Sequence, residues 1–155
     1  METNETTNHV VLEGDRASYI GQVPSPHRLR TFAEVGHRVP LHSTAVGKVL
    51  VAHLPDKALA DLLERIGLPA RTAATITDRD RFRAELADVR RVGYAVDDGE
   101  EADGVYCLAV PVKGADGDMA CALSVSGPAS RVDSLDVLQL SETLRVVARR
   151  LTDAL

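Results

Sequence analysis

The stretch VYCLAVPVKGADGDMACALSVS, residues 105–126, determines the fold class of this chain. Two apolar segments of strand-like composition flank a turn, and the pair Asp116–Gly117 is a strong signal for a tight β-hairpin. If these two residues form the loop, two pairs follow across the hairpin: Ala109 with Ser124, and Cys107 with Ser126. A loop one residue longer would shift this register, because side chains alternate between the two faces of a strand.

The predicted hairpin has two unlike faces. One face is small and lightly polar, and carries Val105, Cys107, Ala109, Ser124 and Ser126. The other is bulky and apolar, and carries Tyr106, Leu108, Val110, Cys121, Leu123 and Val125, so we expect a helix to pack on it. The two cysteines fall on opposite faces, which argues against a disulfide. Pro111 indicates an edge position or a bulge.

The small polar face has two interpretations. It is either a packed layer of small residues whose hydroxyls bond to the backbone, or the floor of a ligand cavity. The strands alone favour the first. Aromatic residues make up only 3% of the chain, so a cavity here would be lined by aliphatic and small side chains and would suit a compact polar ligand.

The rest of the chain alternates strand and helix signals around this hairpin. The order of strands, helices, strands and a helix predicts an α+β domain with a largely antiparallel sheet. The predicted strands are 9–14 and 16–23 around a Gly14–Asp15 turn, a weaker one at 27–34, and 94–98. The predicted helices are 43–54, one with Leu59, Leu62, Leu63 and Ile66 on one face, one opened by Thr77 and Asp80 and ended by Gly93, and one from Ser130 to the C-terminus with a stripe of Leu135, Leu138, Leu144, Val147, Ala148 and Leu151.

Composition excludes several classes of protein. A length of 155 residues indicates one domain, and a net charge of −5 with scattered Lys and Arg argues against DNA binding by this chain itself. The polar first residues and the lack of a long apolar run predict a cytoplasmic protein without membrane contact. Neither the two cysteines nor the histidines have metal-ligand spacing, so no metal or cofactor is expected; His9, His27, His37, His42 and His53 are interpreted as surface or helix-entry residues.

The segment PLHSTAVGKVL, residues 40–50, concentrates polar groups but fits no catalytic motif. It lacks the Gly and Ser/Thr positions of a phosphate loop and the flanking glycines of a nucleophile elbow. We expect Ser43 or Thr44 to cap a helix whose first amides can hold an anion, although water usually fills such a site. Gly47 is expected to allow close packing, and Lys48 to have a solvent or interface role.

The acidic residues from Asp97 to Asp103 form a second polar cluster. Their spacing matches no calcium loop, so an exposed acidic turn is the simpler interpretation. No Ser-His-Asp set stands out either.

Four segments together resemble the effector-binding domain of the IclR family of bacterial transcriptional regulators. They are SPHRLRTFAEVG (25–36), VPLHSTAVGKVLVAHLP (39–55), GYAVDDGEEADGVYCLAVPV (93–112) and CALSVSGPASRV (121–132). They occur in the family's order, and the resemblance extends from about Asn8 to the end of the chain.

This resemblance implies a GAF- or PAS-like domain, with a curved antiparallel sheet and flanking helices, that spans residues 1–155 and is not an enzyme. It implies a sensor that binds a small carboxylate metabolite and forms a homodimer or homotetramer. DNA would be contacted only through an N-terminal winged helix-turn-helix domain, which this chain lacks, so we expect an isolated or a stand-alone sensor. A small enzyme using Cys107 or Ser124, and a dimerisation module with a vestigial pocket, are the alternatives.

The resemblance also implies a set of ligand-binding positions. Backbone amides of Ala45, Val46 and Gly47 would hold the carboxylate, and the Asp97 side chain would meet a ligand hydroxyl or hydrate. The remaining positions are Val105, Cys107, Ser124 and Ser126 on the hairpin, with Leu29 and Thr31 as a wall.

Overall fold

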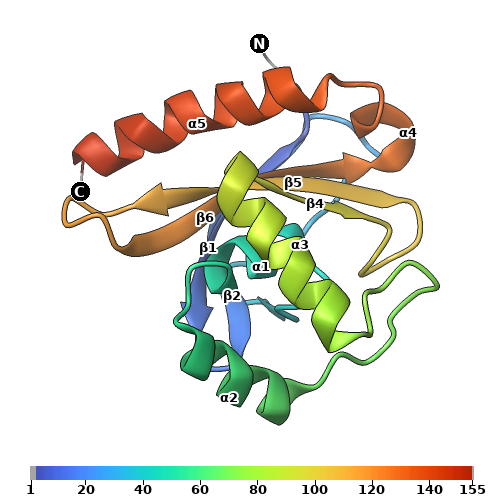
Figure 1. The fold of residues 1–155 in the computed structure, drawn as a ribbon. Helices are drawn as coiled ribbons and strands as arrows, with labels where there is room; N and C mark the ends of the chain where they lie inside the picture. Colours follow the sequence, from blue (N-terminus) through green and yellow to red (C-terminus); the bar gives the residue numbers. More distant parts are fainter. Residues whose placement is uncertain (1–2, 155) are drawn as a thin grey trace.

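One six-stranded antiparallel sheet with helices on both faces forms the protein (Figure 1). The computed structural model describes residues 3–154. The strand order is β3-β2-β1-β6-β5-β4. The strands are β1 Thr6–Glu13, β2 Arg16–Val23, β3 Arg38–Val39, β4 Ala95–Asp98, β5 Val105–Lys113 and β6 Met119–Pro128; the helices are α1 Ala45–Val51, α2 Asp56–Ile66, α3 Arg79–Val92, α4 Ala129–Val132 and α5 Val137–Ala154. The predicted α+β fold, a curved antiparallel sheet with flanking helices, is confirmed.

The sheet separates two apolar cores, as the hairpin faces predicted. On the bulky face, α5 packs against β5 and β6, as Figure 1 shows, and this core contains Tyr106, Leu108, Val110, Leu123, Val125, Leu140 and Leu144. On the small face, α1 lies against the sheet with α2 and α3 outside it, and this core contains Cys107, Ala109, Ala122, Val46, Val49, Leu63 and Phe82. The small residues of the sheet let α1 approach closely, so every residue of this helix is buried.

The hairpin turn is one residue longer than predicted. The Gly117 amide donates to the Gly114 carbonyl at 2.9 Å, and the Gly114 amide donates to the Asp118 carbonyl at 2.8 Å. Three residues therefore lie between Gly114 and Asp118, and the last of them, Gly117, has a φ of +84°. This is a turn closed by a glycine in the left-handed region, a common three-residue hairpin loop.

A β-bulge cancels the effect of the longer loop. The register of β5 against β6 shifts between Val112 and Lys113, and beyond that point the strands pair as the two-residue loop predicted. The predicted pairs are confirmed: Ala109 with Ser124, and Cys107 with Ser126. Cys107 and Cys121 are free thiols on opposite faces. Pro111 lies beyond Ala109, the last residue of β5 that pairs with β4, which confirms its edge position.

The strand predicted at 27–34 is wrong. This segment is an irregular loop, and the neighbouring edge strand is the two-residue β3. Pro24 and Pro26 precede the segment and cannot donate backbone hydrogen bonds to a sheet. Side chains hold the loop instead: Arg131 donates to the Leu29 carbonyl at 2.7 Å, and Thr31 donates to the Ser126 carbonyl at 3.1 Å.

Two helix starts differ from the prediction. The side chain that caps α3 is Asp78, which accepts from the Arg81 amide at 2.8 Å, rather than Thr77. The long C-terminal helix is interrupted: the residues around Ser130 form only the single turn α4, and Asp136 starts α5 by accepting from the Gln139 amide at 3.0 Å.

The buried face of α5 also differs from the predicted stripe. Leu140, Ser141, Leu144 and Ala148 are buried, whereas Leu138 of the predicted stripe is 67% exposed. Among the described residues, no helix has both the length and the apolar character needed to cross a membrane.

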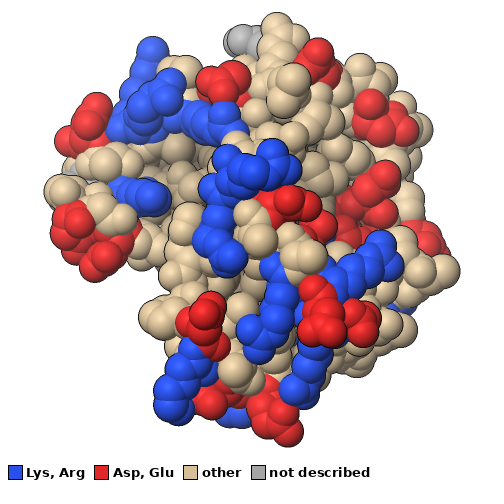
Figure 2. Space-filling model, viewed as in Figure 1, with Lys and Arg blue, Asp and Glu red and all other residues tan. Residues whose placement is uncertain are grey.

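Charges of both signs cover the face drawn in Figure 2. Acidic and basic side chains alternate along α3, whereas blue side chains gather over the C-terminal half of α5, where Arg145, Arg149 and Arg150 lie. Arg145 is tied to its surroundings, because it pairs with Glu142 and donates to the Val92 carbonyl at the end of α3.

Candidate functional site

The two serines of the small sheet face form a hydrogen-bonded cluster with a residue of β1. Asn8 pairs directly with Ser124, and its Nδ2 donates to the Oγ of Ser124 and to that of Ser126, each at 3.2 Å. Asn8 Oδ1 accepts from Gln22 at 2.8 Å. Ser124 is fully buried and Ser126 is 8% exposed. Asn8 was not among the predicted site residues, because only the pairing of β1 with β6 brings it to the serines.

Thr31 extends this cluster from the 24–37 loop. Its Oγ1 lies 2.8 Å from Ser126 Oγ, so a chain of hydrogen bonds runs from Asn8 through Ser126 to the loop. A small cavity of about 50 Å³ lies beneath the loop and is lined by Asn8, Tyr19, Gln22, Thr31, Phe32, Ala33 and Ser126. Leu29 does not join this group: the residue is 71% exposed, and its carbonyl accepts a hydrogen bond from Arg131.

Asp97 and Cys107 pair across β4 and β5 and continue the polar face. Asp97 is 3% exposed, and its Oδ1 accepts from the Glu100 amide at 2.7 Å. Burial is the main cause that raises the pKa of Asp97 to about 7, against the effect of this hydrogen bond. Burial, with a contribution from Asp97, raises the pKa of Cys107 to about 12. Val105 is the first residue of β5, where it pairs with Pro128 and is half-buried.

The start of α1 provides backbone donors beside this face. Thr44 is the capping residue: its Oγ1 accepts from the Gly47 amide at 3.1 Å and donates to the Pro40 carbonyl at 2.6 Å. The cap therefore uses the Gly47 amide. The amides of Ala45 and Val46 have no acceptor within the helix, as at any helix N-terminus.

Gly47 is required by packing. A Cβ at this position would lie 2.3 Å from the Leu41 carbonyl oxygen and 2.4 Å from Leu41 Cα. The close approach predicted for Gly47 is thus a contact with the backbone of Leu41. This contact holds the 40–44 loop against the first turn of α1.

Lys48 is buried, so the predicted solvent or interface role is wrong. Its side chain is fully inaccessible, and Nζ donates to Glu100 at 2.7 Å, to the Val96 carbonyl at 2.9 Å and to Glu85 at 3.1 Å. The amphipathic reading of α1 missed this, because the helix lies between the sheet and α3 and has no solvent face.

The acidic loop is only partly exposed, contrary to its interpretation as an exposed turn. Glu100 is 9% exposed, and its Oε1 has no hydrogen-bond partner among residues 3–154. Glu101 accepts from Ser43 and, at 3.0 Å, from Arg71. The acidic loop is therefore bonded to the 40–48 segment at two places, through Ser43 and through Lys48.

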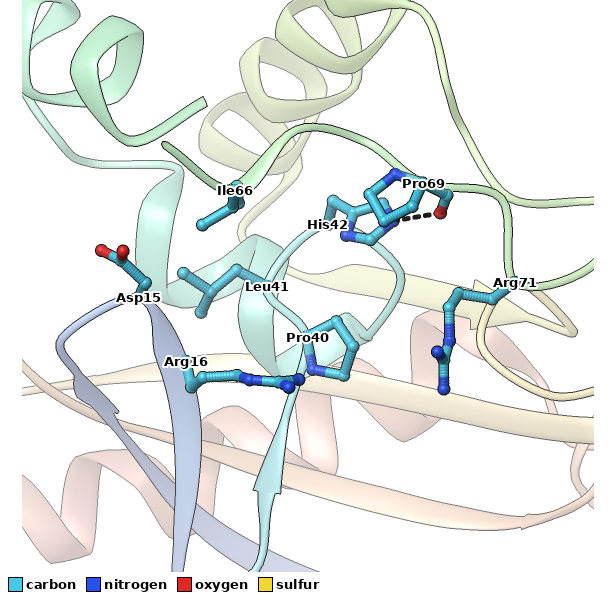
Figure 3. Close-up of a pocket in the computed structure, with 8 residues that line it drawn as sticks. All are labelled: Asp15, Arg16, Pro40, Leu41, His42, Ile66, Pro69 and Arg71. Carbon is cyan, nitrogen blue, oxygen red and sulfur yellow. Dashed lines mark hydrogen bonds between the residues drawn. The ribbon is translucent and has the colours of Figure 1, made fainter. Parts of the chain in front are cut away.

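A second, larger pocket of about 280 Å³ lies outside the 40–44 loop. Figure 3 shows Arg16 beside Pro40, with His42 donating to the Pro69 carbonyl at 2.8 Å. Burial lowers the pKa of His42, so this ring is neutral at pH 7. Arg71 is paired with Glu101, so the charge of its guanidinium is already balanced.

The polar face is suited to binding rather than to nucleophilic chemistry. A thiol whose pKa is near 12 carries almost no thiolate at neutral pH, and the serines are hydrogen-bonded to the Asn8 amide, which is not a base. Within residues 3–154 no cluster of three or more His, Cys, Asp or Glu side chains could hold a metal ion. What the site offers is hydroxyls, an amide, one protonatable carboxyl and two helix-start amides.

Comparison with known sequences shows one family. The family model described as "Bacterial transcriptional regulator IclR C-terminal" matches residues 1–153. The chain is 36% identical over 153 residues to the HTH-type transcriptional regulator XynR of Escherichia coli K12, covering 99% of this chain and 61% of XynR. It is 35% identical over 155 residues to the HTH-type transcriptional repressor AllR of Klebsiella pneumoniae, covering 100% of this chain and 57% of AllR. The chain thus spans less than two thirds of these relatives.

Solved structures agree. The C-terminal domain of the E. coli transcriptional regulator KdgR superposes with a TM-score of 0.84 at 32% identity, covering 97% of this chain and 87% of that one. The inducer-binding domain of the transcription factor PobR from Acinetobacter, solved as a double mutant with 3-hydroxybenzoic acid, superposes with a TM-score of 0.91 at 30% identity, covering 99% of this chain and 90% of that one.

Proposed function

This chain belongs to the IclR family of bacterial transcriptional regulators, as the C-terminal domain, and from that premise we propose that it senses a small carboxylate metabolite. The observation that carries this proposal is the buried polar face. Ser124, Ser126 and Asn8 form a hydrogen-bonded floor on a sheet face that otherwise packs apolar groups. Asn8 and Ser126 of this cluster line the cavity beneath the 24–37 loop together with Thr31, so the paired polar groups lie next to space that a small ligand can occupy.

The donors of the site fit a carboxylate. The amides of Ala45 and Val46 lie at the positive end of α1, where negative charge is favoured. The hydroxyls of Ser124 and Ser126 are neutral donors. Asp97, whose pKa is near 7, can hold a proton and so would repel an anion less than an ordinary carboxylate. We therefore assign the carboxylate to the amide end and a ligand hydroxyl or hydrate to Asp97.

The size of the cavity favours a compact effector. A volume of about 50 Å³ is well below the range of about 300–1,000 Å³ that is usual for drug-sized ligands. Of the predicted positions, Thr31 and Ser126 line this cavity, together with Asn8, whereas Gly47, Val105 and Cys107 are not among its lining residues. Leu29 drops out of this set because of its exposure, and Asn8 enters it. The PobR domain, similar in fold, was solved with 3-hydroxybenzoic acid, which supports a carboxylate-bearing ligand without identifying this one.

The proposed output is control of DNA binding. XynR and AllR are described as HTH-type regulators, and the chain aligns with less than two thirds of each. We propose that effector binding here changes the operator affinity of an attached winged helix-turn-helix domain, in a homodimer or homotetramer. An effector changes that equilibrium only by its different affinity for the two states.

A thermal-shift panel tests the proposal. Acetate, glycolate, glyoxylate, pyruvate, benzoate and 3-hydroxybenzoate are titrated into the chain at constant ionic strength, with the matching amides as uncharged controls. A sensor shows a melting temperature that rises with the logarithm of ligand concentration for some carboxylates and not for their amides. The Ser124→Ala/Ser126→Ala variant should lose most of that rise, whereas Cys121→Ala, on the other sheet face, should keep it. No shift with any carboxylate would favour a dimerisation module with a vestigial pocket.

A further inference from the structure

Packing alone does not account for a charged group at Lys48, whose side chain is fully buried. Desolvating a charge of this kind costs several kcal/mol, and apolar residues often replace buried ion pairs without loss of stability. Yet all three donors of Lys48 are used, each by a different part of the fold: the Val96 carbonyl in β4, Glu100 in the acidic loop and Glu85 in α3. A role in holding these parts in place is the better explanation.

The contacts of Lys48 enclose Asp97 from both sides along the chain. Val96 directly precedes Asp97, and Glu100 follows it by three residues. Asp97 in turn accepts from the amides of Glu100, at 2.7 Å, and Glu101, at 3.4 Å. The Asp97 carboxyl and the backbone of its loop therefore form one unit, and Lys48 joins this unit to α1.

Lys48 also sets the charge around Asp97. Glu100 and Lys48 act on the pKa of Asp97 in opposite directions: Glu100 raises it and Lys48 lowers it, while burial is the largest cause of its rise. The groups that face Asp97 from the elements around it are Glu100 and Glu101 of its own loop, Lys48 of α1, Cys107 of β5 and Tyr19 of β2, with Glu85 of α3 and Arg71 one contact further away. Lys48 is the only cation of this set in direct contact with the acids on both α3 and the loop.

We propose that Lys48 is a positioning residue that determines effector choice, because it holds Asp97 at a fixed place relative to the first amides of α1. The inference rests on the proposed function, in which those amides take the carboxylate and Asp97 takes a hydroxyl. An effector with both a carboxylate and a hydroxyl must then reach the amides of α1 and the Asp97 carboxyl at once, and Lys48 sets the distance between them. A simple carboxylate contacts only the amides of α1, so its binding does not depend on Lys48.

The test compares two variants that differ only at Lys48. Lys48→Met alone leaves Glu100 buried and unpaired, so it is made in a Glu100→Gln background and compared with Glu100→Gln alone. The probes are pairs that differ by one hydroxyl: acetate and glycolate, propionate and lactate, benzoate and 3-hydroxybenzoate. Affinities are measured by calorimetry, and the pKa of Asp97 by carboxyl-carbon NMR without any ligand. The control is Lys57→Met in the same Glu100→Gln background, because Lys57 is a lysine of α2 whose side chain is 88% exposed and pairs with Asp61.

We expect Lys48→Met/Glu100→Gln to lose the preference for the hydroxylated member of a pair, with the plain carboxylate bound as in Glu100→Gln alone. Relative to Glu100→Gln alone, the pKa of Asp97 in the double variant should rise by about one unit or more, the usual scale for removing a nearby opposite charge. Lys57→Met/Glu100→Gln should keep the preference that Glu100→Gln alone shows. If the double variant does not fold, Glu100→Gln alone, which removes one charged arm of the clamp, should lower the preference severalfold relative to wild type.

The outcomes separate the two proposals. An unchanged preference together with an unchanged Asp97 pKa in a folded double variant overturns the role of Lys48 and leaves the sensor intact. Wild-type protein that binds no carboxylate of any pair overturns the proposed function, and the role of Lys48 in effector choice falls with it.

Discussion

Asn8 lies directly opposite Ser124 in the sheet and donates to its Oγ at 3.2 Å, although 116 residues separate them in the chain. The first strand of the chain thereby completes the polar face of the last one. In the protein without ligand the serine hydroxyls are already satisfied, so an effector must offer hydrogen bonds at least as good as those it replaces.

Ser124→Ala and Ser126→Ala should each weaken effector binding without unfolding the protein. Each substitution removes one protein hydroxyl that would bond to the ligand. The binding free energy should fall by about 1 kcal/mol or somewhat more, the usual scale for a single hydrogen bond. Asn8 keeps one acceptor in either single variant, so the unfolding free energy should change by less than about 1 kcal/mol. Calorimetry and urea denaturation measure the two effects. Equal binding by the double variant would remove the serines from the site.

Gly47→Ala should destabilise the domain strongly. The added Cβ would overlap the Leu41 backbone, which cannot move aside as a flexible side chain can. Overpacking typically costs about 1–3 kcal/mol, and a clash with backbone belongs at or above the upper end of that range. Urea denaturation measures the loss.

Gly117→Ala is the matched control for this variant. Nothing lies within 4 Å of a Cβ at Gly117, so only its φ of +84° opposes the substitution. The left-handed conformation costs a non-glycine residue about 1–2 kcal/mol. If Gly117→Ala destabilised the protein more than Gly47→Ala, the close contact with Leu41 would not be the limiting feature.

Asp97→Asn should make stability less dependent on pH. The folded pKa of Asp97, about 7, lies above the value of about 3.9 in an unfolded chain, so the folded protein binds the extra proton between these values. Wild-type stability from this group is present at low pH and is lost as the pH rises toward 7. The unfolding free energy of the variant, relative to that of wild type, should therefore increase by up to about 3 kcal/mol between pH 5 and pH 8, measured by urea denaturation at each pH. A constant difference would contradict the raised pKa.

Cys107 should resist thiol reagents in the folded protein. Its pKa of about 12 leaves roughly a thousandfold less thiolate than a free cysteine has, and the group is buried. Cys121 is half-buried and should react first. Counting the modified thiols in native buffer and in urea checks this, with Cys121→Ala as the control that should show no fast reaction. Rapid native labelling of that variant would reopen the enzyme alternative.

Local sequence patterns predicted the hairpin accurately because strand faces alternate. The small and bulky faces, the separation of the two cysteines and the pairing of Cys107 with Ser126 all follow from a period of two. The pairing held even though the loop is one residue longer, since the bulge near Val112 restores the register. The end of α3 at Gly93 and the cap by Thr44 were also readable from local signals.

Where segments far apart in the chain meet, local patterns were insufficient. The 27–34 loop has strand-like residues, but the prolines before it and its contacts with Arg131 and Ser126 keep it out of the sheet. The buried face of α5 follows Leu140, Leu144 and Ala148, which are four residues apart, and it leaves Leu138 of the predicted stripe exposed. Leu29 was placed by resemblance, and the loop carries its side chain outward.

Patterns among neighbouring residues were enough to predict the architecture and the polar face of the hairpin, and the resemblance of four segments indicated the family. That Asn8 completes the polar face, and that Lys48 lies buried between Glu85 and Glu100, follows only from how distant segments pack. Burial explains the difference. Whether a polar side chain is solvated or desolvated depends on which elements pack over it, and a helix such as α1, covered on every side, has no periodic pattern that reveals this.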